Sequence, residues 1–258
     1  MVFVIGITGG IASGKSSLSK LLLQKLQGSL PEKSEVSLID ADKLGHLAYI
    51  SGSTAYHKLV DRFGAENILT EPGESEDSAH HEERAIDRRK LGAIVFSDKA
   101  EMDALCDIVW PVIRSSIETS LQELGGRDKE QYVILEAAVM LEAKWEDMIS
   151  GMLIVTYVDR DVAKSRLMER NSLSEEEALK RIDAQMGNSE RLTRVCGGEG
   201  GSDDTCEVSF EENNLTFYDG NHKARTTTTF ENRGSEDEMK EATNTIAMKI
   251  LGTDKNLK

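Results

Sequence analysis

Hydrophobic positions along the chain form two kinds of pattern, short unbroken runs and stripes at helical spacing. Most of the unbroken runs are rich in Val, Ile, Leu and Tyr, and the last one, at residues 226–230, is rich in Thr. Such runs are typical of strands buried on both faces of a parallel sheet. Strands are predicted for residues 2–8, 35–42, 131–137, 152–158 and 226–230. Helical segments separate most of these runs, and such alternation predicts an α/β fold, a three-layer parallel sheet covered by helices on both faces.

The helical stripes fall between the predicted strands. The first carries Leu18, Leu21, Leu22 and Leu26 on one face and can end at Gly28. Further helices are predicted for residues 53–64, for most of 85–124 with Pro111 near a helix start, and for 161–170, 175–186 and 236–251. Ser174 and Glu177 have the spacing of a capping box at the start of the 175–186 helix.

Two segments do not fit this alternation. Residues 71–84 are acidic and poor in apolar side chains, which predicts a mobile loop. Residues 193–225 form an insertion that opens with glycines and acidic residues, and Asp219-Gly220 between β-prone flanks indicates a hairpin. Apolar residues are too thin and scattered in this insertion to support a core of its own, so we expect a mobile surface excursion.

A glycine-rich loop follows the first predicted strand. The stretch "GITGGIASGKSS" (6–17) contains Gly9, four residues, then Gly14-Lys15-Ser16, which is the phosphate-binding pattern G-x-x-x-x-G-K-[ST]. Its context between a strand and a helix is the expected one. Glycines let successive backbone N–H groups turn toward phosphate oxygens, and the following helix directs its positive end to the same place. Lys15 supplies a cation at the β- and γ-phosphates, and the Ser16 hydroxyl can ligate Mg²⁺. Lys15 is expected to lie outside the core.

A phosphate loop alone does not separate a kinase from a molecular switch. A guanine-reading N-K-x-D is absent from the sequence. Residues 61–64 match the switch pattern D-x-x-G, but they end an amphipathic helix, so Gly64 is better explained as a helix end.

Two aspartates, Asp40 and Asp42, flank one alanine at the end of the strand predicted for residues 35–42. Alternation along a strand would put both carboxylates on the same side, at the ligand edge of a parallel sheet. One could orient Mg²⁺ and the other could accept a hydroxyl proton. Asp42 could instead be a helix N-cap, and both interpretations can hold together.

Composition narrows the classes of function. The chain has 258 residues, 39% of them hydrophobic, and a net charge of −15, which argues against nucleic-acid or anionic-membrane partners. An anionic substrate therefore needs a local basic site. Two basic sets exist, one of Arg84, Arg88, Arg89 and Lys90, the other of Arg166, Arg170 and Arg181. The second set could be a solvated helix face or a lid that closes over a phosphate.

The redox state and location of the chain can be predicted from its cysteines and its N-terminus. Three cysteines without metal-ligand spacing indicate reduced thiols. No targeting segment is evident, and a cytoplasmic protein is expected, with mitochondrial association left open.

A set of ordered motifs resembles a known family. The motifs are "GITGGIASGKSS", "IDADKLGH", "AIDRRKLGAIVF", "IVWPVIR", "VILEAAVMLEAKW", "RLMERNSLSEEEALKRIDAQM" and "FENRGS". In this order they resemble dephospho-coenzyme A kinase over residues 1–190 and 226–251. "VWP" and "EAAVMLEA" are similar to the eukaryotic form, including the kinase portion of coenzyme A synthase.

This resemblance implies a single kinase domain over residues 1–258, with a nucleoside-monophosphate-kinase-like P-loop core. Residues 43–125 would be the substrate-binding helical segment, and residues 160–190 the lid. The implied reaction moves the γ-phosphoryl of ATP, with Mg²⁺, to the ribose 3′-hydroxyl of dephospho-coenzyme A. A kinase for another nucleotide or small alcohol, and a non-catalytic nucleotide switch or scaffold, stay open as alternatives, and protein partners are unknown.

The resemblance also implies roles for particular residues. Asp42 would be the base, Asp40 would support the metal with Ser16, and Arg170 would close from the lid. His46 and Arg88 would line the acceptor site. The implied ATP-binding residues are Gly9, Gly10, Ile11, Ala12, Ser13, Gly14, Lys15, Ser16, Ser17, Asn232 and Gly234. Glu136 and Glu142 are weaker candidates; Glu136 could support the metal from its strand end.

Overall fold

The computed structural model describes residues 1–71, 84–196, 207–212, 215–219 and 226–254. These residues form two compact units, one of Met1–Asp40 with Leu121–Lys258 and the other of Ala41–Ser120. None of the described helices is both long enough and apolar enough to cross a membrane.

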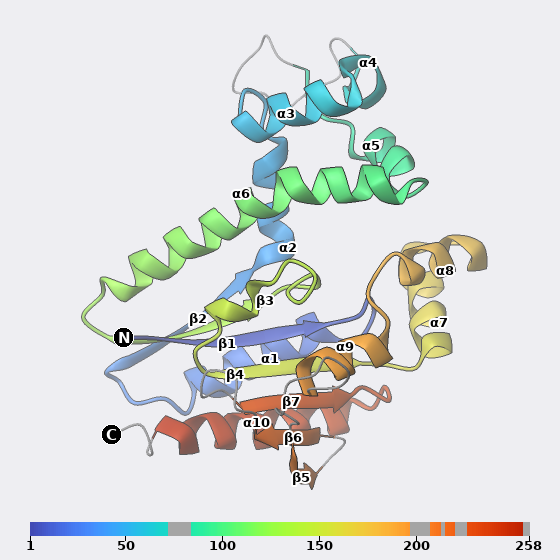
Figure 1. The fold of residues 1–258 in the computed structure, drawn as a ribbon. Coiled ribbons are helices and arrows are strands. Elements are labelled where there is room, and N and C mark those ends of the chain that lie inside the picture. Colours follow the sequence, from blue (N-terminus) through green and yellow to red (C-terminus); the bar gives the residue numbers. More distant parts are fainter. Residues whose placement is uncertain (72–83, 197–206, 213–214, 220–225, 255–258) are drawn as a thin grey trace. The chain divides into compact units, whose positions relative to one another are not determined.

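The first unit is built on one sheet of seven strands (Figure 1). Its strands are β1 (Val2–Gly9), β2 (Ser34–Asp40), β3 (Glu130–Glu136), β4 (Met152–Tyr157), β5 (Glu207–Glu212), β6 (Leu215–Asp219) and β7 (Thr226–Glu231). They lie in the order β2-β3-β1-β4-β7-β6-β5. Every pairing from β2 to β7 is parallel, while β6 and β5 extend the β7 edge as an antiparallel pair. The predicted α/β parallel sheet is therefore confirmed.

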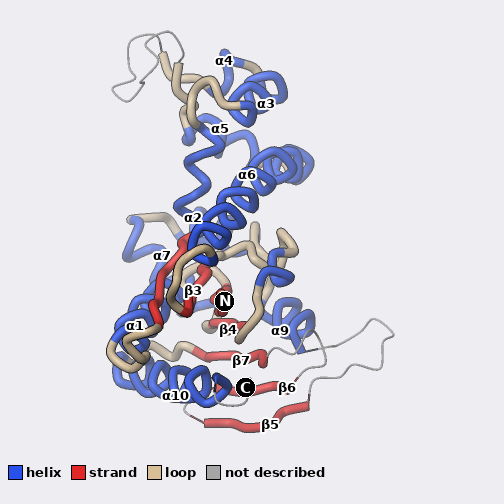
Figure 2. The backbone as a smooth tube through the Cα atoms, turned by 90° about the vertical axis from the view of Figure 1, so that its left-hand side faces the viewer, coloured by secondary structure: helices blue, strands red, loops and turns tan. Residues whose placement is uncertain are grey.

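Helices α1 (Lys15–Gln27) and α10 (Glu236–Asp254) pack against each other and cover one face of the sheet (Figure 2). Leu18, Leu22 and Leu26 of α1 are fully buried there, together with Ile246 and Ile250 of α10. Helix α9 (Asn188–Cys196) contacts β7 and lies on the other side of β4 and β7 from α1 and α10 (Figure 2). The core thus fixes the strand ends from which the phosphate loop emerges.

Two helices follow β4, and a short 3₁₀ turn precedes it. They are α7 (Arg160–Asn171) and α8 (Glu175–Asp183), and the turn is η2 (Trp145–Met148). The predicted capping box is present: the Ser174 hydroxyl accepts from the Glu177 N–H, and the Glu177 carboxylate accepts from the Ser174 N–H at 2.9 Å. Helix α8 ends at Asp183, three residues before the predicted end.

The second unit is helical. Its elements are α2 (Ala41–Leu44), η1 (Gly45–Tyr49), α3 (Thr54–Phe63), α4 (Ala65–Ile68), α5 (Arg88–Val95) and α6 (Lys99–Gly125), the last of which runs on into the first unit. Helix α3 ends at Gly64, whose φ of 84° is a positive-φ helix end. The interpretation of residues 61–64 as a helix end rather than a switch motif is confirmed.

Pro111 lies inside α6, so its predicted place near a helix start is wrong. A proline ring removes one backbone N–H from the helix, which is costly but local. Val109, Ile113 and Ile117, on either side of the proline, are all buried. Burial of this apolar stripe offsets the cost of the proline, so the helix continues past Pro111.

The insertion expected over residues 193–225 is part of the fold. Residues 193–196 complete α9, and β5 and β6 join the sheet. Leu215 is 1% exposed and packs in the main core, so the expectation of a surface excursion is wrong for β6. Asp219 ends β6 in register with Thr226 of β7, and residues 220–225 between them lie outside the described residues. The mobile loop expected at residues 71–84 also lies mostly outside the description.

Replacing Leu215 with alanine tests whether the antiparallel strands stabilise the protein. Removing a fully buried leucine side chain costs about 2–5 kcal/mol of unfolding free energy. We expect Leu215→Ala to lower the urea midpoint accordingly. Met248→Ala is the matched control because Met248 is 64% exposed on α10, and its effect should stay within about 0.5 kcal/mol. Equal, small effects of both substitutions would show that β6 does not anchor the core.

Candidate functional site

The phosphate loop spans the turn between β1 and α1. Gly9, Ala12 and Gly14 have positive φ angles of 152°, 59° and 91°. A Cβ atom on Gly9 would lie 2.1 Å from the Thr156 carbonyl oxygen of β4, and one on Gly14 would lie 2.2 Å from the Asn232 Nδ2. These glycines therefore allow both the backbone turn and its close approach to neighbouring segments.

Side chains from outside the loop hold its backbone groups. Asn232 Nδ2 donates to the Ser13 carbonyl at 2.9 Å, and Arg166 Nη1 donates to the Ala12 carbonyl at 3.0 Å. On the other side, Gln185 Oε1 accepts from the Ile11 N–H at 2.8 Å. Segments far apart in the sequence thus fix the loop in one conformation.

Lys15 begins α1 beneath the loop. Its ammonium donates to the carbonyls of Gly9 and Gly10, each at 3.0 Å, and the residue is only 8% exposed. Lys15 is therefore buried by its own loop, and it is not part of the main hydrophobic core, as expected. The loop curls around the ammonium, and its carbonyls replace part of the hydration that burial removes.

Side-chain oxygens that could ligate a metal ion lie beside the loop, at the ends of β2 and β3. The Ser16 hydroxyl donates to Glu136 Oε1 at 2.5 Å. Asp40 is the register partner of Glu136 on the neighbouring parallel strand, so the two carboxylates leave the sheet side by side. Hydroxyl and carboxylate oxygens suit Mg²⁺, which usually takes one or two carboxylates and completes its shell with water and phosphate oxygens. Larger clusters of metal-ligating side chains are absent from the described part of the chain.

Asp42 is not on the strand that carries Asp40. Strand β2 ends at Asp40, and Asp42 lies in the first turn of α2, as its second residue. The expectation that strand alternation aligns Asp40 with Asp42 is wrong, and so is the N-cap interpretation of Asp42. The chain turns into a helix at Ala41, which is buried, so the register of the strand does not extend to Asp42.

A cavity of about 870 Å³ lies along the phosphate loop. Arg166 and Arg170 of α7 line it, together with Asn232 and Gly234 after β7. Asn232 Oδ1 accepts from the Gly234 N–H at 3.1 Å, which shapes this wall. The structure therefore brings loop residues 12–17 together with Arg170, Asn232 and Gly234 around this cavity. Arg181 of α8 does not line this cavity.

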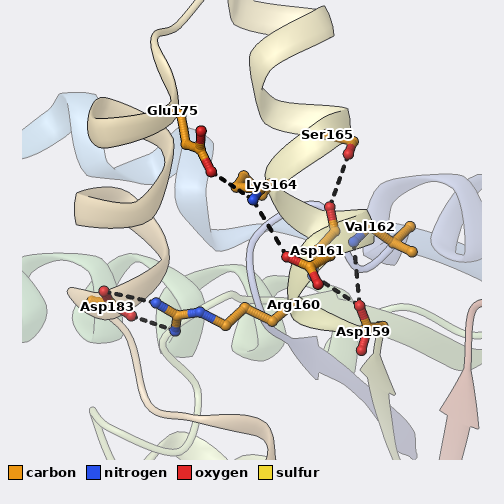
Figure 3. A network of polar contacts seen from close by, with 8 residues as sticks. All are labelled: Asp159, Arg160, Asp161, Val162, Lys164, Ser165, Glu175 and Asp183. Atoms are coloured by element: carbon orange, nitrogen blue, oxygen red, sulfur yellow. Dashed lines mark hydrogen bonds and ion pairs between the residues drawn. The ribbon is translucent and has the colours of Figure 1, made fainter.

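Helices α7 and α8 are tied to each other by ion pairs (Figure 3). Arg160 forms a two-pronged ion pair with Asp183, at 2.5 and 3.0 Å, and Lys164 donates to Glu175 at 2.7 Å. Hydrogen bonding to Asp183 raises the pKa of Arg160, and the same contact lowers the pKa of Asp183. Single exposed pairs add little stability, but these pairs join the two helices at more than one point.

The predicted acceptor residues lie in the second unit. His46 is on η1, and its Nδ1 forms a short contact with the Lys43 carbonyl. Arg88 at the start of α5 stacks over the ring of Tyr49 on η1, at 5.0 Å from the ring centre. Burial raises the pKa of Tyr49, an effect that the Arg88 charge opposes. Arg88 and the helix that carries His46 are thus in contact within this unit.

A phosphate loop at the carboxyl edge of a parallel sheet, a buried lysine and paired carboxylates are the parts of a P-loop phosphotransferase. The chain belongs to the dephospho-CoA kinase family, because the model of that family matches residues 3–196.

Individual relatives agree with this assignment. The chain is 37% identical over 191 residues to dephospho-CoA kinase of Oceanobacillus iheyensis, which covers 74% of this chain and 84% of that protein. Its identity to the Geobacter sulfurreducens dephospho-CoA kinase is also 37%, over 74% of this chain and 85% of that protein. The solved dephospho-CoA kinase from Campylobacter jejuni superimposes with a TM-score of 0.54 at 21% identity, covering 98% of this chain and 100% of that chain, and shows the same fold.

Sequence reasoning gave less weight to several residues that the structure places at the loop. Arg166 and Gln185 bond directly to loop backbone groups. The sequence offered Arg166 only as part of a helix face or a lid, and it singled out nothing for Gln185. Thr156 also contacts the loop, through a hydrogen bond between its hydroxyl and that of Ser13 at 2.7 Å. The signal for Glu136 was its position at the end of a predicted strand, and for Thr156 there was none.

Substituting Gly9 with alanine tests the close approach of the loop to β4. The added Cβ would overlap a backbone oxygen that cannot rotate away, and alanine is strained at this φ. Strain and overpacking together should cost about 2–6 kcal/mol of unfolding free energy. Gly187→Ala is the control, because a Cβ at Gly187 has no described atom within 4 Å. Chemical denaturation of both variants measures the difference, and a Gly9→Ala protein as stable as the control would contradict the geometry.

Proposed function

We propose that the protein transfers the γ-phosphoryl group of ATP to the ribose 3′-hydroxyl of dephospho-coenzyme A, which yields coenzyme A and ADP. The observation that carries this proposal is the phosphate loop closed around Lys15, in a chain that matches the dephospho-CoA kinase family over residues 3–196.

The phosphate loop supplies the donor side of this reaction. Free backbone N–H groups of the phosphate loop and the N-terminal end of α1 bind the β- and γ-phosphates, and Lys15 adds a positive charge there. Ser16 and Asp40, with Glu136, would hold Mg²⁺. When bound, this ion neutralises charge on the phosphate oxygens. Asn232 and Gly234 form the wall for the adenine, and Arg170 approaches the phosphates from α7.

Residues of the second unit supply the acceptor side. Asp42 holds the 3′-hydroxyl and accepts its proton, while His46 and Arg88 bind the rest of the acceptor. The ribose oxygen forms a bond to the γ-phosphorus as the bond from that phosphorus to the β,γ-bridging oxygen breaks. ADP leaves with the electron pair of the broken bond. Because the transition state is loose, Asp42 acts mainly by orienting the hydroxyl, and the proton moves late.

We infer further that the chain has the eukaryotic form of this kinase. Trp110-Pro111 in α6 and the stretch "EAAVMLEA" after β3 support this inference. Residues 43–125 then correspond to the substrate-binding segment, and residues 160–190 to the lid. The ion pairs between α7 and α8 support a lid that moves as one body.

ADP formation should depend on both the acceptor and magnesium. Purified protein with ATP should release ADP rapidly with dephospho-coenzyme A, slowly with adenosine, and not above background with coenzyme A, whose 3′-oxygen already carries phosphate. Excess EDTA should abolish the reaction, and added Mg²⁺ should restore it. A coupled ADP assay measures these rates. Equal rates with and without dephospho-coenzyme A would contradict the proposal and favour an ATPase or switch.

Asp42 and Asp40 should differ in how their loss affects the reaction. Asp42→Asn keeps the shape of the side chain but removes the base, so kcat should fall by about 10²–10⁴ with little change in the KM for ATP. Asp40→Asn should instead raise the Mg²⁺ concentration needed for half-maximal rate. Asp61→Asn on the exposed side of α3 is the control and should leave both parameters unchanged. If Asp40→Asn lowers kcat and Asp42→Asn raises the Mg²⁺ requirement, Asp40 is the base and Asp42 supports the metal.

A further inference from the structure

Arg191 on α9 is a buried cation that has, within the described part of the chain, only one long contact with a carboxylate. Its side chain is 1% exposed, and Nε, Nη1 and Nη2 are all buried without a hydrogen-bond partner among the described residues. Its contact with a carboxylate is an ion pair to Glu142 Oε1 at 3.5 Å, longer than a good charged hydrogen bond. Buried polar groups are normally satisfied, so an exception of this size calls for a ligand or a functional reason.

The guanidinium lies at the phosphate loop. Arg191 Nη1 is 3.4 Å from the position that a Cβ atom on Gly10 would occupy. Lys15 donates to the Gly10 carbonyl, so Arg191 and Lys15 approach the same loop residue. Two cations at one end of a phosphate loop are suited to binding an anionic group.

Arg191 also lines a cavity of about 430 Å³ beneath α7 and α8. Other polar side chains around this cavity are engaged. Arg160 is bound to Asp183, Asn188 Nδ2 donates to the Val158 carbonyl at 2.7 Å, and Gln185 accepts from Ile11. Among the described polar side chains around this cavity, Arg191 is therefore the one whose N–H groups could bind an anion.

We propose that Arg191 donates hydrogen bonds to an oxyanion at the Gly10 end of the phosphate loop, and that this oxyanion is the phosphoryl group being transferred. This assignment rests on the proposed function. A guanidinium presents a planar fork that matches two phosphate oxygens, and in a buried site its interaction with developing charge is strong. Glu142 positions the guanidinium from the segment after β3, and its second oxygen, Oε2, is likewise buried without a hydrogen-bond partner among the described residues.

Burial lowers the pKa of Arg191, and the Glu142 carboxylate acts in the opposite direction. Arginine stays protonated at neutral pH despite such a shift. Glu142 therefore stabilises the charged Arg191 side chain in the absence of the phosphoryl group. At 3.5 Å the pair is long enough to leave the Arg191 N–H groups available to the phosphoryl oxygens.

Arg191→Met tests the assignment, because methionine keeps most of the volume and removes the charge. Calorimetric titration with ADP and with a non-hydrolysable imido analogue of ATP, both with Mg²⁺, isolates the contribution of the γ-phosphoryl group. We expect Arg191→Met to bind the triphosphate analogue about 10–100-fold more weakly and ADP within about two-fold of the unsubstituted protein. Its kcat should fall by about 10²–10³, the scale for one preorganised donor, and Arg191→Lys should lose less.

Arg194→Met is the matched control on the same helix. Arg194 donates to Glu146 at 2.9 Å and does not line the cavity. Both nucleotide affinities and kcat should be unchanged in this variant. If Arg191→Met keeps the wild-type ratio of the two affinities and a kcat within about three-fold, the assignment is wrong.

A purely structural role for Arg191 gives a different result. It would weaken ADP and the triphosphate analogue equally and lower the melting temperature, and that outcome overturns the proposal. Arg191→Met leaves the Glu142 carboxylate buried without its cation, which could destabilise the protein. The double variant Arg191→Met/Glu142→Gln removes that charge as well, so the two nucleotide affinities can be compared in it if the single variant is unstable. Arg191→Lys, which retains a charge, provides a third folded comparison.

Inorganic phosphate distinguishes the transferred group from an independent anion. If phosphate alone raises the melting temperature without nucleotide, and Arg191→Met removes this effect but leaves the ADP and triphosphate affinities unchanged, the site binds a separate anion and the assignment to the transferred group fails.

The nucleotide-binding experiments need no acceptor. Absence of turnover with dephospho-coenzyme A in the unsubstituted protein would therefore refute the proposed function and still leave the Arg191 comparison interpretable.

Discussion

The close packing of the phosphate loop against β4 and the segment after β7 is the constraint on which the rest of the site depends. Gly9 is so close to the Thr156 backbone that no Cβ atom fits between them, and Gly14 is similarly close to the Asn232 side chain. Asn232, Arg166 and Gln185 then fix the loop backbone through hydrogen bonds. A loop held in this way does not have to be ordered by its ligand, which lowers the entropic cost of binding phosphate.

The parallel sheet positions the remaining groups around this loop. Because β2, β3, β1 and β4 are neighbours with parallel register, their carboxyl ends meet at one edge. Asp40 and Glu136 come from adjacent strand ends, and Ser16 reaches Glu136 from the first turn of α1. The helices after β4 bring Arg166 and Arg170 to one side of the loop, and α9 brings Arg191 to Gly10 on another. Charge neutralisation of a phosphoryl group can therefore come from several directions, as a loose transition state requires.

Local sequence signals predicted the elements that build the donor side. The apolar runs and the G-x-x-x-x-G-K-[ST] pattern depend on a few consecutive residues, and they correctly placed the strands, the loop and α1. Asp42 was misplaced because hydrophobic alternation does not mark where a strand turns directly into a helix. Pro111 was misplaced because tertiary burial of Val109, Ile113 and Ile117 outweighs the local preference of proline.

Contacts between distant segments could not be predicted from such signals. Leu215 lies in a polar stretch, and only its pairing beside β7 buries it in the core. Arg191 looks like an ordinary charged helix residue in the sequence, and only the packing of α9 beside the phosphate loop shows that its guanidinium is buried and unsatisfied. Glu136 and Thr156 gain their significance in the same way, from the register of neighbouring strands.

The position of the new phosphate in the product tests the central claim most directly. Purified protein would be incubated with ATP, Mg²⁺ and dephospho-coenzyme A, and the product examined by ³¹P NMR. The account predicts one new phosphomonoester whose phosphorus couples to the ribose H3′ proton, formed in equal amount to the ADP released. Phosphate on another hydroxyl of the acceptor, or release of inorganic phosphate without a new ester, would contradict it.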